Sequence, residues 1–82
     1  MIAVVRRVNK RKNYVVFEVE QGDFGWFDIL DTNEVEEEDT LIGNFHALGE
    51  QNIIHKKTGK KIKVHIEDYG MSYQSAESRI FI

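Results

Sequence analysis

The feature that most restricts how this chain can fold is the stretch from Tyr14 to Leu30, YVVFEVEQGDFGWFDIL. It is rich in aromatic and β-branched residues, it alternates apolar and polar side chains, and a Gln-Gly-Asp break lies at its centre. A period of two residues gives a strand one buried and one solvated face. We therefore expect two antiparallel strands joined by a tight turn at Gln21–Asp23.

The pairing of these two strands decides which side chains reach the core. A slip of one residue would bury Asp28 opposite Phe17, and an unpaired buried charge is costly. We therefore expect the register in which Val19 faces Phe27 and Phe17 faces Ile29. This register leaves an apolar patch on the outer face, made of Tyr14, Val16, Trp26 and Leu30.

Further strand signals flank this central pair. We expect a first strand over Ile2–Val8 and a hairpin turn over Asn9–Asn13, because asparagine tolerates turn conformations. We expect a fourth strand over Thr40–Leu48, with a bulge or bend at Gly43, and a turn over Gly49–Asn52.

The C-terminal part of the chain shows the clearest alternation, from Lys61 to Glu67. Thr58-Gly59 before it is a hairpin signal, since glycine adopts positive φ without strain. After a break at Asp68–Gly70, Ser72 is suited to cap a short helix over Tyr73–Arg79. A terminal strand over Arg79–Ile82 is the alternative.

Together these signals predict an all-β fold, a small antiparallel barrel of five or six strands with at most one short C-terminal helix. The chain has 82 residues and no cysteine, so we expect one domain, residues 1–82, stabilised by packing alone. It has no apolar run long enough for a membrane span and no signal peptide, so we expect a cytoplasmic protein.

The Phe24-Gly25-Trp26-Phe27 run resembles the glycine-aromatic, RNA-contacting strand of cold-shock and S1-type OB-fold domains. This resemblance implies an OB-like barrel whose aromatic residues stack on bases. It departs from the pattern in having Asp23 where those domains carry a basic residue, and acidic residues lie nearby. An SH3-like barrel would give a similar pattern of strands, so it remains the alternative fold.

Charge is segregated along the chain. Of the 14 acidic residues, ten lie between Glu18 and Asp39, whereas ten of the 11 basic residues fall in two clusters. In an OB-fold, the loops joining strands 1–2 and 4–5 flank the ligand. The basic clusters occupy the two expected loops, where they would hold phosphates while aromatic side chains stack on bases. The predicted nucleic-acid-binding residues are Lys10, Arg11, Lys12, Tyr14, Trp26, Lys56, Lys57, Lys60 and Lys61.

The leading hypothesis is thus a non-catalytic module that binds single-stranded RNA or DNA. The alternative is a protein-interaction module that docks an apolar anchor on the Trp26 face, as a monomer or a weak homodimer. Charged turns that only keep loops hydrated would give the same basic clusters.

No catalytic residue, metal site or cofactor is predicted. The acidic run Asp31–Asp39 lacks the spacing of an EF-hand loop, so we interpret it as a solvated loop. His55 and His65 would share one outer face if Ile54 points inward, but no third ligand accompanies them. We expect these histidines and His46 to be solvated or packed at strand edges.

Overall fold

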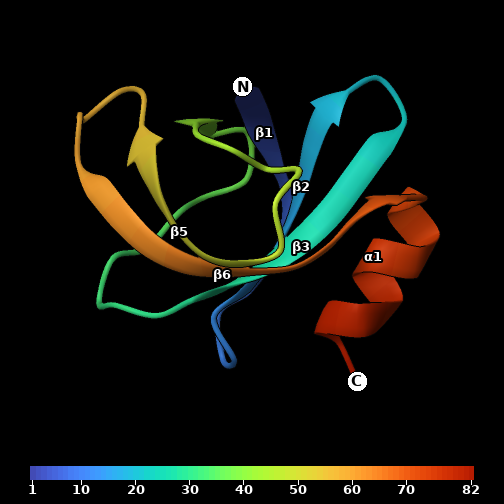
Figure 1. Cartoon of the computed structure of the whole chain (residues 1–82). Coiled ribbons are helices and arrows are strands. Elements are labelled where there is room, and N and C mark those ends of the chain that lie inside the picture. The colour runs from blue at the N-terminus through green and yellow to red at the C-terminus, as the bar shows by residue number, and fades with distance from the viewer.

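A computed structural model describes residues 1–82 and shows a closed barrel of six antiparallel strands with one C-terminal helix (Figure 1). The predicted all-β class is therefore confirmed, and the barrel is compatible with both OB-like and SH3-like architectures. Its strand order is β1-β2-β3-β6-β5-β4, and β4 closes the barrel by pairing with β1. The elements are β1 (Ile2–Asn9), β2 (Tyr14–Glu20), β3 (Asp23–Ile29), β4 (Thr40–Ile42), β5 (Gly49–His55), β6 (Lys61–Met71) and α1 (Tyr73–Ile80).

The barrel interior is filled by apolar side chains from all six strands and from two loops. The predicted inward residues of β2, β3 and β6 are buried, including Phe17, Phe27 and Ile66, except that Val19 is only partly buried against this core. Phe45 and Val35, which lie in loops, are also buried and complete the core. Phe17 contacts both Phe27 and Phe45, with ring centroids 5.9 and 5.0 Å apart respectively.

The predicted register between β2 and β3 is wrong. Val15 faces Phe27 and Phe17 faces Gly25, a displacement of four residues from the expected pairing. The reason is space, because a Cβ at Gly25 would lie 2.5 Å from the Phe17 ring and 2.4 Å from the Asp68 carbonyl oxygen. Gly25 lets Phe17 pack over the strand. Because the displacement is even, the predicted inward and outward faces survive.

The region from Thr40 to Asn52 also differs from the prediction. β4 ends at Ile42, residues 43–48 form a loop, and the predicted turn at Gly49–Asn52 belongs to β5. Gly43 makes no bulge within a strand; it packs against Ile53, where a Cβ would come within 2.7 Å of a side-chain carbon. The chain leaves the sheet after β4 because this loop carries Phe45 into the core.

The C-terminal part is largely as predicted. The turn at Thr58-Gly59 is present, with a φ of 74° at Gly59. β6 continues through the predicted break at Asp68–Gly70 as far as Met71. Ser72 caps the helix by accepting a hydrogen bond from the Ser75 N–H. The alternative of a terminal strand is wrong.

Candidate nucleic-acid interface

Both basic turns lie at one end of the barrel. Since neighbouring strands are all antiparallel, the β1–β2 turn, the β3–β4 loop and the β5–β6 turn share that end. The two turns are nevertheless separated around that end, and Figure 1 shows the β1–β2 turn at the bottom of the view and the β5–β6 turn at the upper left. The acidic β3–β4 loop, residues 30–39, pairs with residues at or next to both turns and closes this end of the barrel with buried Val35.

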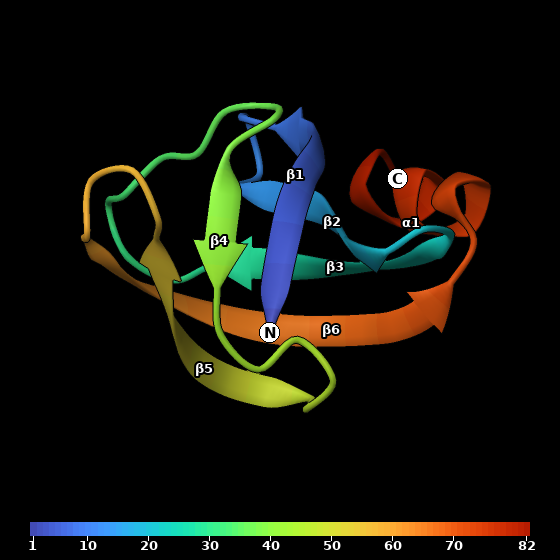
Figure 2. The ribbon, with the colours of Figure 1, turned by 90° about the horizontal axis from the view of Figure 1, so that it is seen from above.

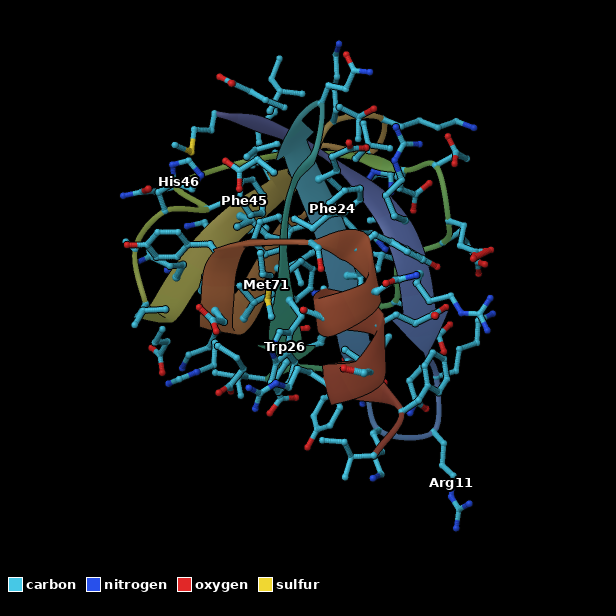
Figure 3. All side chains as sticks on the ribbon, turned by 90° about the vertical axis from the view of Figure 1, so that its right-hand side faces the viewer. Arg11, Phe24, Trp26, Phe45, His46 and Met71 are labelled. Atoms are coloured by element: carbon cyan, nitrogen blue, oxygen red, sulfur yellow. The ribbon has the colours of Figure 1, made fainter.

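The β1–β2 turn contributes few free charges. The Lys10 ammonium lies 3.3 Å from a Glu36 carboxylate oxygen, and the Lys12 ammonium donates to the main-chain oxygen of Ile82. Arg11 makes no ion pair, and Figure 3 shows it extending away from the body of the molecule. Of the three predicted phosphate contacts in this turn, only Arg11 is without a partner.

The β5–β6 turn is different, because its lysines are exposed and none lies within ion-pair distance of a carboxylate. The side chains concerned are Lys56, Lys57, Lys60 and Lys61. The turn itself is well ordered by hydrogen bonds. The His55 N–H donates to the Lys60 carbonyl oxygen at 2.9 Å, and the Gly59 N–H donates to the His55 carbonyl oxygen at 2.8 Å.

His55 joins this lysine turn to the acidic loop. It is 8% exposed, because Ile53 and His55 face inward and Ile54 does not. The expectation that His55 shares an outer face with His65, or is solvated, is therefore wrong. Its Nε2 lies 2.9 Å from an Asp39 carboxylate oxygen, and the Thr58 N–H donates to its Nδ1 at 3.4 Å. The ring that accepts at Nδ1 donates from Nε2, so the neutral tautomer satisfies both contacts.

The electrostatics of Asp39 fit this role. Its partial burial acts to raise the pKa, but hydrogen bonds from the Glu36 N–H and from His55, together with the positive charge of Lys57, hold the pKa of Asp39 below its usual value. The carboxylate is therefore ionised at neutral pH. It orients the histidine from which the lysine turn begins.

The predicted aromatic face is largely covered. α1 packs across β1, β2 and β3, and its Ala76 and Ile80 form a second apolar cluster with Val16. Val16 is fully buried there, so it is unavailable for the predicted docking face. Tyr14 and Trp26 are half-buried at the edge of this cluster, with ring centroids 5.2 Å apart, edge to face. Figure 3 shows Trp26, Phe24 and Met71 beside the helix.

Acidic and imidazole groups lie on the outer face between the two aromatic residues and the lysine turn. Asp28 pairs across the strands with Tyr14 on one side and with His65 on the other. Its pKa is raised, chiefly because burial disfavours the charged form and also because Glu67 is near, although His65 opposes the shift. A Glu67 carboxylate oxygen lies 2.9 Å from His65 Nδ1, in a geometry that makes no hydrogen bond.

The acidic loop forms contacts within the protein. Glu38 accepts two hydrogen bonds from Arg6, at 2.9 and 3.0 Å, and Arg6 also pairs with Glu18 at 2.8 Å. No group of three or more histidine, aspartate or glutamate side chains is placed to hold a metal ion. The acids of this loop therefore neutralise cations of the first basic cluster and orient His55.

Two parts of this interface were missed from the sequence. The His55–Asp39 contact joins residues 16 positions apart, and only the position of a histidine directly before a lysine-rich turn signalled it. The coverage by α1 had a stronger signal. Tyr73, Ala76 and Ile80 repeat at helical spacing, and such a stripe requires an apolar face elsewhere in the fold.

Comparison with protein-family models, curated proteins and solved structures finds no match to this chain. The structure contains no helix with the length and apolar character needed to cross a membrane. The function of the interface must therefore be argued from its own residues.

Proposed function

We propose that this protein is a non-catalytic module that binds single-stranded nucleic acid, and that the β5–β6 turn supplies the main phosphate contacts. The observation that carries the proposal is the lysine turn, defined as Lys56, Lys57, Lys60 and Lys61. These four cations are exposed on an ordered turn and form no ion pair with a carboxylate. Phosphate groups are the partners that such a cluster favours, because binding releases condensed counterions.

The Tyr14–Trp26 pair supports a single-stranded ligand. Both rings remain partly accessible beside α1, and unpaired bases stack on aromatic side chains in a manner that tolerates any sequence. Tyr14 directly follows the β1–β2 turn, so Arg11 would meet phosphates near the stacked bases. The similarity of Phe24-Gly25-Trp26-Phe27 to cold-shock and S1-type OB domains favours RNA as the ligand.

The covering helix changes how the ligand would lie. In the path expected for an OB-fold, a strand crosses β2 and β3, but α1 occupies much of that face. We propose that the ligand instead follows the outer face of β3 and β6, from the exposed edge of Trp26 to the lysine turn. Asp28 and Glu67 lie on this route, and their negative charges reduce the affinity for a polyanion.

The proposal is tested by an NMR titration of isotope-labelled protein with short single-stranded RNA and DNA. We expect shifts at Lys56–Lys61, with smaller shifts at Trp26 and Arg11, that fade as salt is added. The matched control is a variant in which the four lysines of the turn are replaced by alanine. A flat titration at low salt, or unchanged affinity in that variant, would overturn the proposal.

A further inference from the structure

A row of exposed aliphatic side chains crosses the barrel wall on the strands β1, β4 and β5. Ile2 faces Ile42, and Ile42 faces Ile54, so the three residues lie side by side on adjacent strands. Figure 2 shows β4 between β1 and β5 on this wall. A neighbour of each residue in the chain is buried. Because successive side chains of a strand point to opposite faces, the row faces outward. These buried neighbours are Ala3, Leu41 and Ile53.

This isoleucine row (Ile2, Ile42 and Ile54) is accessible to a partner. Ile2 is 56% exposed and Ile42 is 39% exposed, while Ile54 is half-buried. Val4, two residues after Ile2 on the same face, lines a surface depression of about 260 Å³. Adjoining apolar side chains of this kind mark interaction sites more often than isolated ones do. The row, and not the depression, is the apolar surface, because Arg6, Glu18, Glu20 and Gln21 also line the depression.

Two lysines that make no ion pair border the β4–β5 side of the row. Lys61 faces Ile54 directly, and the Lys56 N–H bonds the Thr40 carbonyl oxygen next to Ile42. Three of the nearby carboxylates are engaged by partners within the protein, whereas Glu20, at the β1 side beside the depression, is not. Glu18 and Glu38 contact Arg6, and Asp39 contacts His55. A partner that covers the row would therefore gain most from carrying acidic groups.

The chemistry of the row favours a polypeptide over the other anionic partners. Isoleucine has no π face on which a base could stack, so the row adds little to nucleic-acid binding. The row also lies on paired strands in the wall of the barrel, whereas the element that typically lies in a lipid surface is an amphipathic helix. An acidic peptide with an aliphatic or aromatic anchor satisfies both the apolar row and the lysines.

We infer that the isoleucine row is the docking site for an acidic peptide segment of a partner protein. The anchor of that segment packs on Ile42 and its neighbours, and its carboxylates pair with Lys56 and Lys61. This surface is distinct from the aromatic residues Tyr14 and Trp26, although it shares lysines with the proposed nucleic-acid path. Peptide and nucleic acid would therefore compete for the protein.

The test is a selection from a randomised peptide display library with the full chain as bait. We expect enriched peptides to combine aspartate or glutamate with a large apolar residue. The affinity of one enriched peptide is then measured by fluorescence anisotropy. Ile42→Ser should weaken binding by about 10-fold or more, as expected for a central interface residue. Leu48→Ser is the matched control, because Leu48 is 62% exposed but lies in the loop outside the row.

Circular dichroism establishes that each variant is folded, and Ile54→Ser replaces Ile42→Ser if the latter is not. Failure to enrich acidic peptides, or equal binding by wild type and Ile42→Ser, would overturn the inference. Binding to phosphatidylserine vesicles that depends on Ile42, without peptide binding, would overturn it in favour of a lipid partner. Oligonucleotide affinity should not change in Ile42→Ser, so failure of this inference is distinguishable from failure of the proposed function.

Discussion

The β1–β2 turn and the β5–β6 turn have similar basic sequences but different surroundings. In the first, Lys10 pairs with Glu36 and Lys12 binds a main-chain oxygen of the C-terminal segment. In the second, none of the four lysines forms an ion pair, although the charge of Lys57 acts on Asp39, and His55 and main-chain hydrogen bonds order the turn. The comparison shows that a basic cluster in a sequence gives the number of charges, whereas the fold decides how many remain for a ligand.

The largest expected difference is in the salt dependence of oligonucleotide binding. Each phosphate contact to a single strand contributes about 0.7 to the slope of log affinity against log salt concentration. Alanine at all four lysines of the lysine turn should therefore reduce the slope by about 3. Alanine at Lys10, Arg11 and Lys12 should reduce it by about 1 or less, because only Arg11 is unpaired. Equal reductions measured by anisotropy in the two variants would remove the proposed difference between the turns.

The second prediction concerns the histidine that orders the lysine turn. His55→Ala leaves the Asp39 carboxylate and the Thr58 N–H without their partner, so we expect a loss of about 1–3 kcal/mol in the free energy of unfolding. Chemical denaturation measures this loss. His46→Ala is the control, because His46 makes a similar 2.9 Å contact with Asp23 on the surface. The control should lose about 1 kcal/mol or less. A smaller loss for His55→Ala than for His46→Ala would contradict the role given to His55.

The third prediction concerns Asn9, the last residue of β1, which directly precedes the β1–β2 turn. The Asn9 side-chain amide donates to the Ile80 carbonyl oxygen at 2.6 Å and so ties β1 to the end of α1. Asn9→Ala should lower the free energy of unfolding by about 1 kcal/mol, in line with the loss of one hydrogen bond. Arg11→Ala, two residues away and without a partner, should change it by less than about 0.5 kcal/mol. Thermal denaturation measures the stability of both variants. A larger loss of stability in Arg11→Ala than in Asn9→Ala would contradict this prediction.

The smallest effect is expected at Asp28, beside the proposed ligand path. Its folded-state pKa is raised mainly by burial, so its contribution to stability is fully present below the unfolded pKa and is lost as pH rises through the folded pKa. Asp28→Asn should therefore raise the melting temperature at neutral pH but bring little gain at pH values below the unfolded pKa. It should also strengthen oligonucleotide binding slightly, since one negative charge is removed. Stabilisation of equal size at both pH values would show that burial of the charge is not the cause.

The central strands show how far alternation can predict a fold. It gave the inward faces of β2, β3 and β6 correctly, including Phe17, Phe27 and Ile66, because a period of two admits only two faces. It gave the wrong register, because the pairing depends on Gly25 making room for Phe17 beneath β6. The Gly25 in the run that resembles an RNA-contacting strand thus serves the packing of this barrel.

The candidate site was less predictable than the fold. The positions of the lysines in a turn followed from the Thr58-Gly59 signal, and the lysines are indeed exposed there. Their freedom from carboxylates, and the pairing of Lys10 and Lys12, depend on residues 26 and 70 positions away. No local pattern in a single sequence records contacts over such separations.

The sequence by itself determined the all-β class, the turns at residues 10–13 and 56–60, and the Ser72-capped helix. These features depend on local backbone preferences and on side-chain alternation, which act over a few residues. Only the tertiary structure decided that α1 covers Val16 and that Phe45 leaves the predicted strand to fill the core. It also decided that Lys10 and Lys12 of one basic turn have partners while the lysines of the other form no ion pair. These outcomes depend on volume and charge complementarity between segments far apart in the chain, and such complementarity exists only once the barrel has closed.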